Sequence, residues 1–248
     1  MIQDLHSHTY YSFCGKDDPC TVVETAIAGG VELLGICDHS YGIGNARKDV
    51  NKYENPELGQ DYYRTLQRYF DHISLVREKY AGKIKILRGI EVATHQWRLR
   101  AALPEGVDIS FFDYCLVEDL DDETSITGGD LFTFAKRCGC PTGVAHTDLF
   151  AHISGLGVDP LTYCKRMARE GIFWEINVNY DSVHHFEEHE YVKRFFADAT
   201  QQSIVRESGV RLSVGFDGHR VEEYNSARVR EACDRIHAMG IKLAFEDA

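Results

Sequence analysis

The 248-residue sequence lacks the features that direct a chain into a membrane or out of the cell. No apolar run approaches the ~20 residues that a membrane-spanning helix requires. The first residues, MIQDLHSHTYYS, contain no basic segment followed by an apolar stretch, which a secretory signal would have. We therefore expect a cytoplasmic protein that does not bind a membrane.

Positive charge is also scarce in this chain. The 27 Lys and Arg residues stand against 39 Asp and Glu residues, which gives a formal net charge of −12. Nucleic acids and anionic membranes are bound by basic surfaces that displace counterions. The acidic balance therefore argues against nucleic acid as a partner, and nothing in the sequence indicates an oligomeric state.

The eight cysteines form no C-x-x-C pair and are spread along the chain. This spacing excludes a zinc ribbon or a thioredoxin-type site and makes a disulfide framework improbable. Cys37 and Cys115 lie inside apolar runs, so we predict that both are reduced and buried.

Short apolar runs alternate with longer amphipathic segments along the whole chain, which predicts strands alternating with helices. The predicted strands are 2–6, 33–39, 84–92, 112–119, 142–146, 173–178 and 212–216. The predicted helices are 21–29, 61–80, 130–137, 160–170, 187–208 and 222–239. Such alternation favours parallel strands with right-handed crossovers, and we predict an α/β protein in which residues 1–248 form one barrel-like domain.

Two stretches, 40–59 and 92–108, hold most of the residues without periodicity. We predict that they form long loops after the second and third strands. In a parallel α/β barrel, the loops that follow the strands form the active-site face.

Histidine and acidic residues recur at the carboxyl ends of six of the predicted strands. They are Asp4, His6 and His8 at the first strand, Asp38 and His39 at the second, Glu91 at the third, His146 and Asp148 at the fifth, Glu175 with Asn177 at the sixth, and Asp217 and His219 at the seventh. A single histidine at a strand end is usually structural, but these ends all converge on one face of a barrel. Imidazole and carboxylate ligands suit Zn, Mn or Fe, so we predict a metal site.

Five strings in this chain, DLHSHT, CDH, GIE, AHTD and GFDGH, resemble in order the motifs of the PHP (polymerase and histidinol phosphatase) superfamily. The helix before KIKILRGIEV is similar to the histidinol-phosphatase branch. The resemblance implies a distorted seven-stranded (β/α) barrel with two or three divalent metal ions at the carboxyl ends of its strands. The ligands that it implies are His6, His8, His39, Glu91, His146, Asp217 and His219, with Glu91 as the bridging carboxylate.

The chain departs from the PHP pattern at two positions. Where the family often has a histidine after the first motif, this chain has Cys14, whose thiolate could bind a soft metal, unless Asp17 or a water takes that place. At the end of the fourth strand the chain offers Asp119 as a metal ligand, within an acidic run at 118–123 that is equally typical of a solvated turn. A carboxylate there would favour a harder ion such as Mn or Mg. Two ions are therefore expected, and a third depends on these positions.

The resemblance implies a metal-dependent phosphatase in which a metal-activated water attacks the phosphorus, so no catalytic side chain is assigned. Asp38, Asp148 and Asn177 are predicted to orient the histidine rings.

The predicted substrate is a small phosphorylated metabolite. Arg220 is the candidate phosphate-binding residue, with Lys16 and Arg47 as further cations. The resemblance makes histidinol phosphate the first candidate, and the acidic run at 118–123 could meet its cationic amine. A nucleotide, a sugar phosphate or another amino-alcohol phosphate fits the sequence equally well.

Two other hypotheses remain at this point. The segment from His185 to His189 fits the H-x-x-E-H motif of a zinc protease, which needs both histidines on one helix. Alternatively, the chain is a degenerate PHP barrel that binds metal without catalysis.

Overall fold

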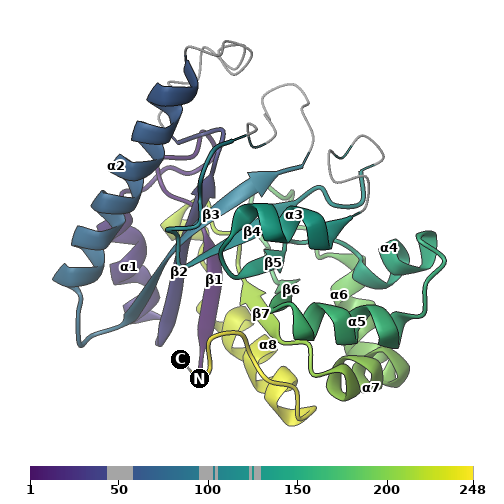
Figure 1. Cartoon of the computed structure of the whole chain (residues 1–248). Coiled ribbons are helices and arrows are strands. Elements are labelled where there is room, and N and C mark those ends of the chain that lie inside the picture. Colours follow the sequence, from purple (N-terminus) through teal and green to yellow (C-terminus); the bar gives the residue numbers. More distant parts are fainter. Residues whose placement is uncertain (44–57, 95–102, 104–105, 123–124, 126–129, 248) are drawn as a thin grey trace.

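The computed structural model describes residues 1–43, 58–94, 103, 106–122, 125 and 130–247, without the side chains of 58–62. It contains a parallel seven-stranded sheet in which the strands pair in sequence order (Figure 1). The strands are β1 Gln3–Ser7, β2 Leu33–His39, β3 Lys85–Ala93, β4 Tyr114–Glu118, β5 Thr142–Val144, β6 Ile172–Asn177 and β7 Leu212–Gly215. A parallel bridge between Ser7 and Gly218 joins the end of β1 to the residues after β7. The sheet is therefore a nearly closed barrel, and the predicted fold class is confirmed.

The helices lie on the outside of the barrel, with α2 against β3, α5 against β6, and α8 against β7 and β1 (Figure 1). They are α1 Pro19–Ala28, α2 Leu58–Lys79, α3 Leu131–Cys138, α4 Leu149–Gly155, α5 Pro160–Arg169, α6 Glu190–Ala197, α7 Ala199–Ser208 and α8 Ser226–Ala238. A short 3-10 helix, η2, spans Val221–Glu223. Within the described residues, no helix combines the length and apolar character needed to span a membrane.

Aspartate side chains set where several helices begin. Asp18, Asp130 and Asp159 each accept a backbone N–H hydrogen bond in the first turn of α1, α3 and α5. Asp198 does the same for α7 and thereby interrupts the single helix predicted over 187–208. Asp148 caps α4, a helix that the sequence analysis did not predict. The single helix predicted over 222–239 is also divided, because the short helix η2 precedes α8 there.

The two predicted loops lie mostly outside the described residues, which exclude 44–57, 95–102 and 104–105. Cys37 and Cys115 are both buried free thiols, which confirms the prediction for these two cysteines.

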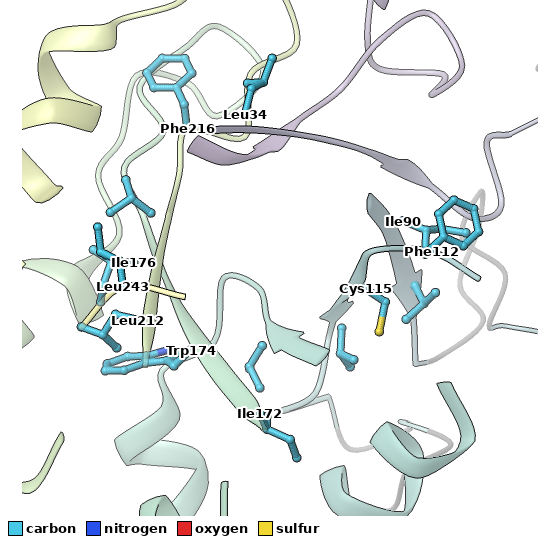
Figure 2. Close-up of a cluster of buried hydrophobic side chains, with 14 of the residues drawn as sticks. Leu34, Ile90, Phe112, Cys115, Ile172, Trp174, Ile176, Leu212, Phe216 and Leu243 are labelled. Carbon is cyan, nitrogen blue, oxygen red and sulfur yellow. The ribbon is translucent and has the colours of Figure 1, made fainter. Parts of the chain in front are cut away.

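The barrel wall separates two hydrophobic clusters. The larger one fills the space between the strands and the helices, and Figure 2 shows part of it, with side chains from β2, β3, β4, β6 and β7. The smaller one fills the barrel interior beneath the carboxyl ends of the strands and includes Leu33, Leu87, Tyr114 and Leu116. Alternate residues of a strand face opposite sides of a sheet, so each strand contributes to both clusters.

Tyr114 occupies the barrel interior because two neighbouring strands carry glycine beside it. Its hydroxyl donates a hydrogen bond of 2.5 Å to the carbonyl oxygen of Leu5. A Cβ atom at Gly35 would lie 2.0 Å from the Tyr114 hydroxyl, and one at Gly89 would lie 2.4 Å from its Cζ. Both glycines are therefore required by the packing of one ring.

We expect Gly89→Ala to lower the free energy of unfolding by about 3 kcal/mol, because the new methyl group displaces the Tyr114 ring from a filled interior. Urea denaturation followed by circular dichroism measures this. Gly155→Ala is the matched control, since no atom lies within 4 Å of a Cβ built at that position. Equal midpoints for the two variants would contradict this account of the packing.

Arg88 and Asp113 form a bidentate ion pair at the start of β4. The two donor–acceptor distances are 2.9 Å from Arg88 Nε and 2.7 Å from its Nη2. Burial alone would raise the pKa of Asp113, but the hydrogen bonds from Arg88 outweigh it and hold that pKa below its usual value. A carboxyl group whose pKa is lowered by folding stabilises the folded state above its unfolded pKa, and this stabilisation is lost as the pH falls.

We therefore expect Asp113→Asn to cost about 2 kcal/mol of stability at pH 7 and progressively less as the pH falls below about 4. Urea midpoints measured from pH 3 to pH 8 test this. Asp234→Asn, on an exposed position of α8, is expected to match the wild type throughout. A difference between Asp113→Asn and wild type that does not change with pH would refute the electrostatic explanation.

Candidate metal centre

The carboxylate of Glu91, on β3, lies between four imidazole rings and is completely buried. Its Oε1 is 3.3 Å from His6 Nε2 and 3.0 Å from His146 Nε2. Its Oε2 is 2.7 Å from His39 Nδ1 and 3.5 Å from His8 Nε2. These rings come from β1, β2 and the segments after β1 and β5, so the barrel brings together residues that are far apart in the sequence. The position suits a bridging carboxylate.

Asp217, just after β7, faces the same histidines from the other side. Its Oδ1 is 3.0 Å from His8 Nε2 and 3.5 Å from His6 Nε2. The third imidazole on this side belongs to His219, whose Nε2 lies 3.8 Å from the same oxygen. Asp217 itself has φ of 55°, a left-handed conformation, at the point where the chain turns after β7.

The far nitrogens of two rings are held by other side chains. His6 Nδ1 lies 2.8 Å from Glu175 Oε1, and His8 Nδ1 lies 3.2 Å from the hydroxyl of Ser12. Asp38 accepts a hydrogen bond of 2.7 Å from that hydroxyl, so it reaches His8 through Ser12 and not directly. This pattern leaves the Nε2 atoms directed at the carboxylates, as metal-ligating histidines require.

Gly215 makes the contact between Glu175 and His6 possible. A Cβ atom at this position would lie 2.1 Å from Glu175 Oε1 and 2.6 Å from His6 Cβ. The first glycine of the string GFDGH therefore has a role at the site that the sequence analysis did not assign.

Asn177 and Asp148 do not contact the histidine rings as predicted. Asn177 Nδ2 donates to Glu175 Oε2 and to Asp217 Oδ2, at 3.3 Å each, so it orients carboxylates. Asp148 caps α4 and pairs with Arg194, so the prediction for this residue is wrong.

Cys14 lies within the cluster. Its sulfur and one nitrogen each of His8 and His39 lie within 4.8 Å of one another. Burial raises the pKa of the Cys14 thiol, but the opposing effect of His39 and His219 is larger, so the pKa falls to about 7. Asp17, the alternative, instead accepts a backbone hydrogen bond of 2.9 Å from Val221.

At the end of β4 the structure brings Glu118 into the cluster, whereas the sequence pattern predicts Asp119. Glu118 Oε1 is 3.4 Å from His39 Nδ1, and these two residues group with Glu91. Glu118 follows Tyr114 and Leu116 at two-residue steps, so it faces the barrel interior as they do. The chain turns at Asp119, which has φ of 61°, and within the described residues Asp119 belongs to no potential metal-binding group.

The buried atoms at this site fit divalent ions. Among the described residues, His6 Nε2, His39 Nδ1 and Glu91 Oε2 are buried without a hydrogen-bond partner. The last two are 2.7 Å apart but lack the alignment of a hydrogen bond. Unpaired buried polar atoms are costly, and a cation between them removes that cost.

The predicted phosphate-binding cations are not part of this cluster. Arg220 lines a cavity of about 20 Å³ together with Thr25 of α1, and it forms no ion pair with cluster residues in the described part of the chain. Lys16 is exposed. Arg47 lies outside the described residues.

The H-x-x-E-H segment is not helical, and the zinc-protease hypothesis is wrong for this reason. His185 and Phe186 have φ values of 56° and 55°, and α6 begins only at Glu190. His185 is exposed, whereas His189 lies 3.1 Å from Asn179 Nδ2. The two histidines therefore do not share a helix face.

Two residues that the sequence analysis did not single out, Asp181 and His184, also join the cluster, beside His219. They follow β6 in the string NYDSVHH. The signal for them was the one used elsewhere, an acid and a histidine after a predicted strand, but four and seven residues beyond Asn177.

Comparison with known proteins agrees with this architecture. Residues 4–208 match the family model described as the PHP domain. No curated protein matches the sequence. The crystal structure of histidinol phosphate phosphatase from Lactococcus lactis subsp. lactis Il1403, complexed with zinc, L-histidinol and phosphate, is similar, with a TM-score of 0.53 and 17% sequence identity. The alignment covers 97% of this chain and 95% of that one. At this identity the similarity concerns the fold.

Proposed function

Because the chain belongs to the PHP domain family, we propose that it is a metal-dependent phosphatase that hydrolyses a small phosphomonoester. The observation that carries this proposal is the buried carboxylate of Glu91 between four imidazole rings. The residues of such a centre would hold two or three divalent ions, which would supply Lewis-acid chemistry for phosphate hydrolysis.

The proposed ligands combine imidazole, carboxylate and one thiol. They are His6, His8, Cys14, His39, Glu91, Glu118, His146, Asp217 and His219. Glu118 replaces Asp119 in this set because it faces the barrel interior. Imidazole and carboxylate suit Zn, Mn and Fe alike, and the thiol of Cys14 favours zinc among them.

Bound ions would supply the positive charge that neutralises the phosphate and activates a water as nucleophile. The chain's own residues fix the geometry. Glu175 and Ser12 hold the rings of His6 and His8. Asn177 holds the carboxylates of Glu175 and Asp217, between which the His6 ring lies. Preorganised ligands of this kind lower the cost of orienting the reacting groups.

Histidinol phosphate is the first substrate to test, because the similar Lactococcus protein is a histidinol phosphate phosphatase. Within the described part of the run 118–123, Asp121 and Asp122 are exposed after β4, and their carboxylates could meet an amine. Glu118 of the same run is turned into the metal cluster.

A phosphatase screen over a metabolite panel, with Mn, Zn and Fe supplied separately, tests the proposal. We expect the wild type to hydrolyse p-nitrophenyl phosphate and a chelator to abolish this activity. We expect His6→Ala to lose the activity and His185→Ala to keep it. Metal content far below one ion per chain, with no activity restored by any ion, would refute the enzymatic function and leave a non-catalytic barrel. Cleavage of histidinol phosphate no faster than of generic monoesters would remove only the substrate assignment.

A further inference from the structure

The carboxylate of Asp181 holds two imidazole rings at once. Its Oδ1 lies 2.7 Å from His184 Nδ1, and its Oδ2 lies 3.2 Å from His219 Nδ1. The Asp181 side chain is completely buried. Glu175 holds His6 Nδ1 in the same way, at 2.8 Å. A carboxylate on the far nitrogen is the usual companion of a metal-ligating histidine.

With their Nδ1 atoms on Asp181, both rings direct Nε2 at Asp217. His184 Nε2 is 3.2 Å from Asp217 Oδ2, and His219 Nε2 is 3.8 Å from Asp217 Oδ1. His184 therefore faces one oxygen of this carboxylate while His8 and His6 face the other.

The segment after β6 is folded to place His184 there. The His184 backbone N–H donates to Asp181 Oδ1 at 2.9 Å, and the Phe186 N–H donates to the Asp181 carbonyl at 2.8 Å. His185 and Phe186 adopt positive φ, which turns the chain back on itself. Ser182 binds Glu223 of η2 through its hydroxyl at 2.8 Å, so the segment is tethered at its start.

The ligand atoms of Asp181, His184 and His219 lie within 4.8 Å of one another, a group that shares no residue with the other three potential metal-binding groups among the described residues. The His184 side chain is 24% exposed, whereas those of His6 and His8 are buried. With Asp181 occupied by the two Nδ1 atoms, the donors left for an ion are the Nε2 atoms of His184 and His219 and the carboxylate of Asp217.

We propose that His184 is an additional metal ligand at the mouth of the centre, and that Asp181 is the positioning residue that directs its Nε2 toward the ion held by Asp217. The inference rests on the proposed function only in requiring an ion at Asp217. It assigns to the segment after β6 a part in metal binding, which the strand-end motifs do not include.

The test compares His184→Gln with His185→Gln, an exposed histidine at the next position and thus a matched control. Equilibrium dialysis against buffered zinc or cobalt, followed by elemental analysis, gives the number and affinity of bound ions. We expect His184→Gln to lower the affinity for one ion per chain by a factor of about 10 to 100, and Asp181→Asn to have the same effect. His185→Gln is expected to bind ions as the wild type does. Circular dichroism in chelator must show that all variants are folded.

Nitrogen NMR of the imidazole rings provides a readout that a purely structural role would not move. Zinc is expected to shift the Nε2 resonance of His184 and to leave that of His185 unchanged. Wild-type affinity for every ion in His184→Gln, or an unshifted His184 resonance at full occupancy, would overturn the proposal. Because neither measurement needs turnover, loss of an ion in His184→Gln without any phosphatase activity in the wild type would refute the proposed function alone.

Discussion

Glu91→Gln is expected to reduce kcat/KM for a phosphomonoester by at least ~10³-fold, or about 4 kcal/mol of transition-state stabilisation. The amide keeps the size of the side chain but removes the negative charge and one acceptor oxygen. Both oxygens of Glu91 face imidazole nitrogens, at 2.7 to 3.5 Å, so the substitution affects every ion that shares this carboxylate. Steady-state kinetics on p-nitrophenyl phosphate with added zinc or manganese measures the loss.

The same preparation should contain fewer bound ions than the wild type, and elemental analysis checks this independently of activity. Glu187→Gln, at an exposed position, is the control for a change of charge alone and should retain full activity. If Glu91→Gln keeps more than a tenth of the wild-type activity, Glu91 does not bridge the ions of the reaction.

The barrel and much of the cluster were predictable because both follow from regular features of the sequence. Each buried strand is a short apolar run, and parallel strands place their carboxyl ends on one face. This rule alone is enough to predict that histidines such as His6 and His39 lie close to Glu91.

The choice between Glu118 and Asp119 required the register of β4 as well as its location. Tyr114 and Leu116 both look like core residues in sequence, but which cluster they join depends on the neighbouring strands. Only when they are placed inside the barrel does the two-residue step turn Glu118 inward. The predicted strand was also one residue too long at this end, since it stopped at Asp119.

Asp181 and His184 were not predictable from strand positions, because a tightly turned segment carries them back to the site. The turn depends on positive φ at His185 and Phe186, neither of which is glycine. The H-x-x-E-H pattern in the same segment favours a helix. The segment instead forms a turn, which is held by hydrogen bonds to the side chain and the carbonyl oxygen of Asp181.

Removal of the metal ions is expected to lower the melting temperature by about 5–10 °C. An ion at 100 times its Kd stabilises the folded state by about 2.7 kcal/mol, and each kcal/mol corresponds to about 2–4 °C in a chain of this size. Without ions, the buried carboxylates of Glu91, Asp217 and Asp181 depend on histidines that must be protonated to balance them. Thermal unfolding with and without chelator, alongside elemental analysis, measures the difference.

The pH dependence of this shift separates ion binding from general electrostatics. Metals bind neutral imidazole, so each bound ion displaces protons from the histidines, and the stabilisation by metal must grow as the pH rises from 6 to 8. A non-specific salt effect has no such slope. Glu91→Gln should show a smaller chelator shift at every pH, because it lacks the carboxylate that we propose as the bridging ligand. A shift that is equal in the two proteins would mean that the ions that stabilise the fold bind somewhere other than around Glu91.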